Sequence, residues 1–158
     1  MQGTPAVIEV LNEILTSELT AINQYFIHAK MLDNWGYDRL SEKVMHESID
    51  EMKDADKIIE RILFLDGVPN LQRLGNVTVG ETVAEQFDLD YAVEVAAVAR
   101  YNRAIELCTS EHDHGTREIL EDLLRGEENH ADWLESQMEL IRQVGLENYL
   151  AQQIRDDD

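Results

Sequence analysis

The sequence predicts an all-α protein: one four-helix bundle built from two helical hairpins. Its 158 residues include only two prolines and eight glycines, and all of these but Gly126 stand outside or at the edges of long stretches with apolar residues at helical spacing. The second half also repeats the first, because Glu94 and Glu127 lie 76 positions after Glu18 and Glu51. A chain of this length forms one ordinary domain with a real core. Each half of the repeat is therefore expected to supply one hairpin.

The first hairpin is expected at residues 5–35 and 38–66. Pro5 lies near the start of the first helix, and Gly36 follows its end. Gly67 and a proline shortly beyond it end the second helix, in the order that is common at helix C-termini. Because the turn between the two helices is short, they should be antiparallel neighbours.

The second hairpin is expected at residues 81–111 and 115–144. Gly115 marks the break between its two helices, and Gly145 ends the second of them. A short fifth helix is expected at residues 146–154. The same short-turn argument makes the two long helices of this half antiparallel neighbours.

A long polar connection, residues 68–81, joins the two hairpins. It contains Gly75 and Gly80 and is long enough to cross the length of a bundle. Two αα-hairpins joined by one such crossover make the ferritin-like arrangement of a four-helix bundle. The acidic tail at residues 156–158 is expected to fray.

Composition excludes several classes of function. The formal net charge of −20 repels nucleic acid phosphates and anionic membrane surfaces and favours cations as ligands. No apolar run is long enough to span a bilayer, and no secretory signal pattern opens the chain. The single cysteine, Cys108, cannot form an internal disulfide, so we expect a cytoplasmic protein.

The repeated acids lie on the apolar faces of their helices. On a helical wheel, Glu18 and Glu51 lie within the apolar arcs of the first two helices, and Glu94 and Glu127 lie within those of the other two. Further candidate ligands lie one turn along from two of these acids, namely Asp54 after Glu51 and His130 after Glu127.

Several buried carboxylates require positive charge, and no Lys or Arg lies on these inner arcs. Metal ions can supply that charge. A site rich in oxygen ligands, with one or two imidazoles, suits Fe or Mn better than structural Zn. With 33 acidic residues, one such match is expected by chance, whereas the repeated set is not. The pattern therefore predicts a two-metal site between four helices.

The chain resembles the bacterioferritin family along nearly its whole length. The similar segments include residues 21–25 (AINQY), 46–52 (HESIDEM), 61–65 (RILFL), 69–71 (PNL), 127–130 (EENH) and 145–150 (GLENYL). The resemblance implies a homo-oligomeric hollow shell of 24 subunits built from two-fold dimers. It also implies two Fe ions per subunit at a ferroxidase centre, ferric mineral stored in the cavity, and haem b shared between paired subunits. A bacterioferritin-associated ferredoxin would supply the electrons for iron release.

The resemblance assigns roles by position. Glu18 and Glu94 would be terminal ligands, Glu51 and Glu127 would bridge the two irons, and the single imidazole at this site, His130, would ligate one of them. The family has a second His where this chain has Asp54. One interpretation is a retained centre in which the extra negative charge favours Fe(III). The other is an impaired centre that binds one iron weakly.

Met52 lies about 100° round the second helix from Glu51 and therefore points out of the bundle. It belongs to an outer apolar stripe with Met45, Ile49, Ile59 and Leu63, which a stripe of Leu15, Leu19, Ile22 and Phe26 matches on the first helix. A second apolar face indicates a partner subunit. From the residues alone, Met52 is interface packing; the resemblance implies that it is an axial haem ligand.

Three further residues are weaker candidates. Tyr25, on an inner arc, either donates a hydrogen bond or an electron to the centre or is a core tyrosine. His46 and Asp50 share one helix face, and the resemblance implies that they bind iron on the cavity surface. His28 is expected to be structural or solvated.

Taken together, these features predict an iron-storage protein with ferroxidase activity. Three alternatives stay open. The chain is a haem-bearing companion subunit with a poor di-iron centre in a mixed shell, or a soluble di-iron oxygenase or peroxidase with an organic substrate, or a metal-binding bundle without catalysis.

Overall fold

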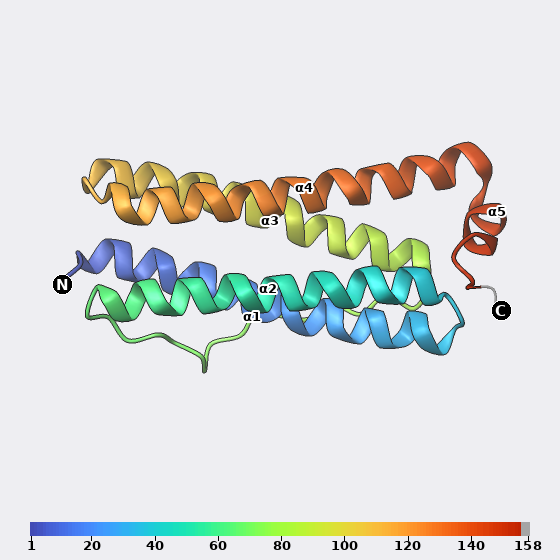
Figure 1. Cartoon of the computed structure of the whole chain (residues 1–158), viewed down its shortest axis with the longest axis horizontal. Coiled ribbons are helices and arrows are strands. Elements are labelled where there is room, and N and C mark those ends of the chain that lie inside the picture. Colours follow the sequence, from blue (N-terminus) through green and yellow to red (C-terminus); the bar gives the residue numbers. More distant parts are fainter. Residues whose placement is uncertain (156–158) are drawn as a thin grey trace.

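A computed structural model describes residues 1–155, and the acidic tail expected to fray lies outside that range. The predicted all-α bundle with a short C-terminal helix is confirmed (Figure 1). The helices are α1 (Pro5–Asn34), α2 (Asp38–Phe64), α3 (Val83–Ser110), α4 (His114–Val144) and α5 (Leu146–Ala151). The fifth helix is shorter than expected, and Gly115 lies inside α4 rather than before it.

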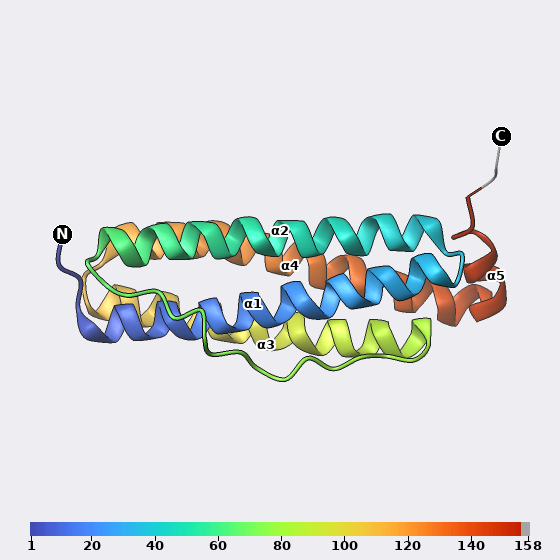
Figure 2. The ribbon, with the colours of Figure 1, turned by 90° about the horizontal axis from the view of Figure 1, so that it is seen from below.

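The two hairpins, α1–α2 and α3–α4, pack side by side with α1 against α3 (Figure 1). The crossover from α2 to α3 runs the length of the bundle along α1 and α3 (Figure 2). In the part of the chain that the structure describes, no helix is long and apolar enough to cross a membrane.

The crossover is fixed to a polar row on α1, with one member per helical turn: Asn12, Thr16, Thr20, Gln24 and His28. The backbone N–H of Asn70 donates to the first of these side chains at 2.8 Å. That of Gly75 donates to the third at 2.9 Å, and that of Gly80 donates to the last at 3.0 Å. The row supplies partners for backbone groups that have none within a helix.

The helix ends are set by local chemistry. The hydroxyl of Thr82 accepts a hydrogen bond from the N–H of Glu85 at 3.2 Å and so caps the start of α3. After α2 the left-handed residue is Asp66 (φ 59°) and not the expected Gly67. Gly67 is required for another reason: a Cβ there would lie 2.8 Å from the Cγ2 of Ile8.

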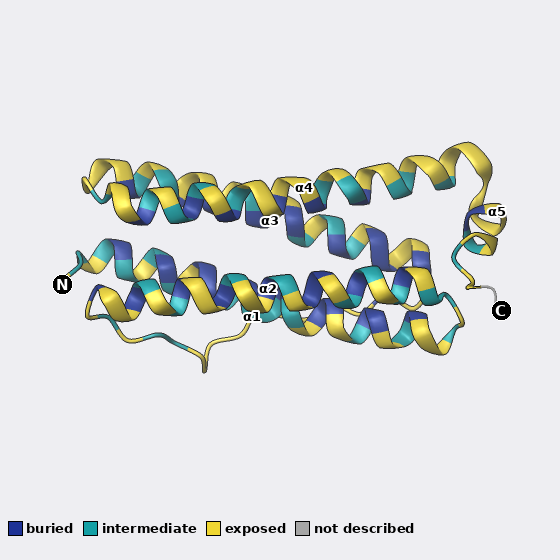
Figure 3. Cartoon of the chain, in the orientation of Figure 1, coloured by how far each residue is buried: buried dark blue, intermediate teal, exposed yellow. Residues whose placement is uncertain are grey.

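The core consists of two apolar clusters with a polar layer between them. One cluster contains Leu11, Ile58 and Leu120, and the other contains Leu40 and Leu134. In each long helix, the segments that contribute to the two clusters are separated by one of the four repeated glutamates, so the carboxylates lie in mid-bundle. Figure 3 shows these buried positions on the inward faces of the helices.

Leu15 is a correction to the sequence interpretation. It was expected in the outer stripe of the first helix, but it is fully buried in the first apolar cluster. The inner and outer apolar faces of α1 lie close together round the helix, and a helical wheel alone does not fix the boundary between them.

Candidate metal centre

Four helices each contribute one glutamate to the middle of the bundle. Glu18, Glu51, Glu94 and Glu127 are between 0 % and 4 % exposed. Each lies where the inward face of its helix meets those of the other three, as the apolar arcs of the sequence require. Four carboxyl groups from distant parts of the chain therefore share one enclosed layer.

The candidate ligands form two overlapping groups. The ligand atoms of Glu51, Glu94 and His130 lie within 4.8 Å of one another. Those of Glu18, Glu51, Asp54 and Glu127 do so as well, so that Glu51 belongs to both groups. The structure thus brings together all six residues that the repeat singled out for the di-metal site.

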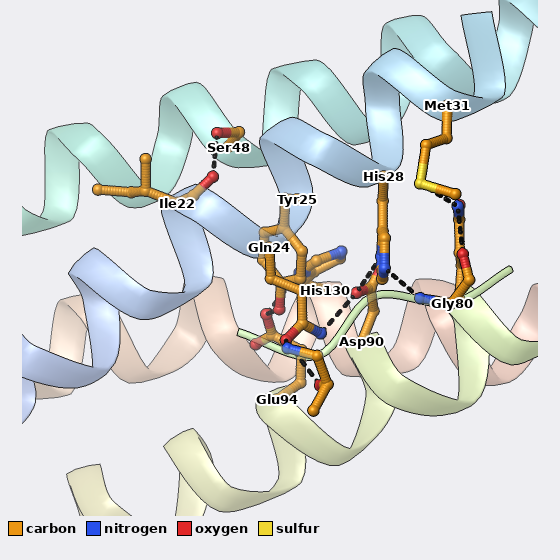
Figure 4. A network of polar contacts seen from close by, with 12 residues as sticks. Ile22, Gln24, Tyr25, His28, Met31, Ser48, Gly80, Asp90, Glu94 and His130 are labelled. Atoms are coloured by element: carbon orange, nitrogen blue, oxygen red, sulfur yellow. Dashed lines mark hydrogen bonds and ion pairs between the residues drawn. The ribbon is translucent and has the colours of Figure 1, made fainter. Parts of the chain in front are cut away.

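Two tyrosines link the hairpins across this layer. The hydroxyl of Tyr101 donates to Oε1 of Glu18 at 2.7 Å, and the hydroxyl of Tyr25 donates to Oε1 of Glu94. Tyr101 lies 76 positions after Tyr25, so the two bonds are equivalent in the repeat. Each tyrosine orients the carboxylate of the other hairpin, and Figure 4 shows Tyr25, Glu94 and His130 converging.

His130 is enclosed by acids and aromatic rings. Its Nδ1 lies 2.8 Å from Oε1 of Glu94 and 3.5 Å from Oε2 of Glu47. The ring of Trp133 stacks on it with centroids 6.1 Å apart, and Tyr25 packs edge-on at 5.2 Å. Burial lowers the pKa of His130, so the imidazole is neutral near pH 7, as a metal ligand must be.

Burial makes the carboxylates reluctant to ionise unless a cation is present. It raises the pKa of Glu18 to about 8 and the pKa values of Glu94 and Asp54 to about 7. The pKa values of Glu51 and Glu127 are also raised well above the ordinary range, again chiefly by burial and then by neighbouring carboxylates.

Several carboxylate oxygens of the layer have no hydrogen-bond partner. Among the described residues, the unpartnered buried carboxylate oxygens are Oε2 of Glu18, Oε2 of Glu94 and Oε1 of Glu127. Unpaired buried acceptors are expensive, and oxygen ligands aimed at one another are what a hard divalent cation requires. The residues present therefore fit iron.

Asp54 lies where this layer opens to the surface. A groove of about 320 Å³ between α2 and α4 reaches Glu51 and Asp54, with Lys57 and Asp122 on its walls. Burial raises the pKa of Asp54, and the ammonium of Lys57 partly offsets this effect. Among the six residues of the centre, Asp54 and Glu51 are thus the two that line this groove, and Asp54 is the more exposed of them.

His46, Asp50 and Met52 are not part of this centre, although Asp50 lines the groove that reaches Asp54. His46 is exposed, and Asp50 is half-exposed with its carboxylate 3.9 Å from Nζ of Lys53. Within residues 1–155, neither belongs to a group of three or more converging metal ligands. Met52 is 59 % exposed on the outer stripe, beside the similarly exposed Ile49 and Leu63.

A buried network next to the centre was not predicted from the sequence. Oδ1 of Asp90 accepts hydrogen bonds from Nε2 of Gln24 at 2.9 Å and from Nδ1 of His28 at 2.8 Å. Since Nε2 of His28 accepts from the N–H of Gly80 at 3.0 Å, the imidazole is neutral, with its proton on Nδ1 (Figure 4). The i, i+4 spacing of Gln24 and His28 places both side chains on one helix face, which was the only sequence signal for this network. Their shared partner, Asp90, is 62 residues from His28 and could not be identified from that spacing.

Comparison with known proteins identifies the same architecture. The Ferritin family (ferritin-like domain) matches residues 8–144. A bacterioferritin from Mycolicibacterium paratuberculosis is 51 % identical over 152 residues, which is 96 % of each chain. A bacterioferritin from Mycobacterium tuberculosis is 49 % identical over the same length and coverage. One from Streptomyces coelicolor is 49 % identical over 151 residues, or 96 % of this chain and 90 % of the relative.

Proposed function

The chain belongs to the bacterioferritin family of ferritin-like proteins, and on that premise we propose that it oxidises Fe(II) at the buried centre and stores the Fe(III) produced. The observation that carries this proposal is the convergence of unpartnered carboxylate oxygens from different helices in one buried layer. Two Fe(II) ions bound there as substrate give up two electrons, which is the number that reduces O₂ to peroxide. Carboxylates favour the Fe(III) product because they neutralise its higher charge.

The ligand roles follow from the two groups. Glu51 belongs to both, which supports a bridging role for it, and Glu127 is proposed as the second bridge. Glu18 and Glu94 are proposed as terminal ligands, each oriented by one tyrosine hydroxyl. A neutral His130 completes one metal position.

Asp54 is proposed to complete the other position. Its carboxylate lies within 4.8 Å of the other three ligands of its group, which supports a retained centre over an impaired one. The groove between α2 and α4 reaches Asp54 and is therefore proposed as the route by which iron reaches and leaves the centre. His46 and Asp50 are proposed to bind iron on the cavity surface.

The outer stripe supports the proposed assembly. Phe26, Ile49, Met52 and Leu63 are between 45 % and 59 % exposed on one chain. We propose that two chains pair through this face and that twelve such pairs form the 24-subunit shell of the family. When haem b is bound, it supplies one-electron transfer into the shell. The thioether of Met52 is exposed, which supports the proposal that Met52 of each chain would ligate the haem, and a bacterioferritin-associated ferredoxin is the proposed reductant.

The test is addition of Fe(II) to purified protein without oxygen, followed by stopped-flow mixing with O₂. We expect a fast phase that consumes about two irons per chain, the loading of a two-metal site. Glu127→Gln should slow this phase by more than about tenfold, because it removes a charged ligand. The neighbouring Glu128→Gln is the matched control, since Glu128 is exposed.

A wild-type protein without the fast phase would contradict the proposal, as would equal rates in the Glu127 and Glu128 variants. Isolation of the native shell gives a further check. A second chain type in that shell, combined with a slow phase alone, would favour the companion-subunit alternative.

A further inference from the structure

The two metal positions of the centre differ in their donor atoms. One group offers four carboxylates, from Glu18, Glu51, Asp54 and Glu127. The other offers the imidazole of His130 with the carboxylates of Glu51 and Glu94. Oxygen-only sites suit Mn²⁺, Mg²⁺ and Ca²⁺, whereas imidazole suits Fe²⁺ and Zn²⁺.

The surroundings of the two positions differ in the same sense. In the repeat, Asp54 corresponds to His130 and Lys57 corresponds to Trp133, because each residue lies 76 positions before its counterpart. Trp133 stacks on the imidazole of His130, while Lys57 lines the same groove as Asp54 and brings a cationic side chain to the carboxylate position. The carboxylate at position 54, in place of an imidazole, is thus accompanied by a lysine at position 57, in place of a tryptophan. A cationic neighbour is what a site that keeps a carboxylate is expected to have.

The all-carboxylate group also contains two of the unpartnered buried oxygens, Oε2 of Glu18 and Oε1 of Glu127. These side chains are 1 % and 2 % exposed, and their groups converge within 4.8 Å. Hard oxygen ligands without hydrogen-bond partners therefore converge at this position.

We propose that the two positions select different divalent metals, with Mn²⁺ preferred at the Asp54 position and Fe²⁺ or Zn²⁺ at the His130 position. The chain would then bind a mixed-metal pair. This inference rests on the proposed di-metal centre and specifies its metal chemistry. It implies that Mn²⁺ competes with only one of the two irons.

The test uses metals that do not react with O₂ under the assay conditions. The assembled protein is freed of metal and given one equivalent each of Mn²⁺ and Zn²⁺ per chain. We expect electron paramagnetic resonance to show isolated Mn²⁺ next to diamagnetic Zn²⁺ rather than coupled Mn–Mn pairs. Anomalous diffraction at the Mn and Zn absorption edges should place Mn²⁺ beside Asp54 and Zn²⁺ beside His130.

Two reciprocal variants serve as controls. Asp54→His gives both positions an imidazole, so the metals should distribute statistically and coupled Mn–Mn pairs should appear. His130→Asp gives both positions carboxylates alone, so the chain should retain Mn²⁺ in both positions at least about tenfold better against Zn²⁺ than wild type does.

Equal distribution of the two metals in the wild-type protein would overturn the inference, and so would Mn²⁺ beside His130. Neither result bears on iron oxidation, which the stopped-flow assay measures separately. Conversely, a correct metal partition in a protein without a fast oxidation phase would retain this inference and refute the ferroxidase.

Discussion

At the scale of single residues, the unusual groups are the carboxyls whose pKa values lie near neutrality. Burial raises the pKa of Asp54 and Glu94 to about 7 and the pKa of Glu18 to about 8. Each must lose its proton before it can bind a metal, so protons and metal ions compete for the same oxygens. Metal affinity should therefore fall as pH falls through this range.

We accordingly expect proton release when Zn²⁺ binds to the metal-free protein. At about pH 6 the metal must displace more than one proton per chain, and this number should fall as the pH rises from about 6 to about 9, because Asp54, Glu94 and Glu18 lose their protons over that range. Isothermal titration calorimetry in buffers with different ionisation enthalpies measures this number. A number that does not change with pH would show that these carboxyls are not the groups that the metal displaces.

The site ligands were predictable because two sequence signals coincided. Each of the four glutamates lies on an apolar arc, and each recurs at the 76-residue offset. Glu47 and Asp90 also lie on apolar arcs but lack the second signal, since their counterparts in the repeat are Leu123 and Ile14. Their positions beside His130 and His28 depend on how the helices pack, which one sequence does not specify.

At the scale of the elements, the crossover depends on α1. The polar row of α1 supplies a side-chain partner at successive turns, and its last two members, Gln24 and His28, also bond Asp90 of α3. The crossover, α1 and α3 are thus joined through a single buried carboxylate. Asp90 is close enough to the metal centre to affect the pKa of Tyr25 and of His130.

Replacing His28 with leucine should release the end of the crossover. The N–H of Gly80 and the carboxylate of Asp90 would each lose a buried partner, at about 1–3 kcal/mol for each group. Hydrogen–deuterium exchange should therefore rise in peptides that contain residues 75–82. His114→Leu is the matched control, because His114 is exposed at the start of α4. Equal exchange in the two variants would show that this network does not fix the crossover.

The helices themselves were largely predictable, and their ends less so. Apolar periodicity with Gly36 and Gly145 located α1 and α4, and both glycines do have positive φ angles, of 89° and 85°. At the end of α2 the same reasoning assigned the turn to Gly67, whereas Asp66 adopts the left-handed conformation. Aspartate tolerates the left-handed region, so Asp66 can adopt it. Gly67 allows close packing against Ile8 instead, and a glycine of that kind does not mark the left-handed residue.

At the scale of the whole molecule, one chain leaves an apolar face uncovered. Its two internal clusters enclose the metal centre, yet the outer stripe leaves Phe26, Ile49, Met52 and Leu63 substantially exposed. Large apolar side chains grouped on one face are typical of an interface between subunits. Because α1 and α2 carry both this face and half of the candidate metal ligands, the proposed pairing of chains would also fix the helices that position the centre.

The exposed methionine gives a prediction that separates haem binding from assembly. Met52→Leu keeps an apolar side chain of similar volume on the stripe but removes the thioether sulfur, which is the proposed haem ligand. We expect the shell to form at unchanged mass by light scattering, while haem per shell falls to near zero in the absorbance spectrum. Met45→Leu, on the same stripe, should retain its haem.

Because two thioethers favour Fe(II) and raise the haem potential, the Met52 variant should also release stored iron more slowly on reduction. Full haem content in the Met52 variant would show that the ligand lies elsewhere, while loss of the shell would assign Met52 to packing between subunits.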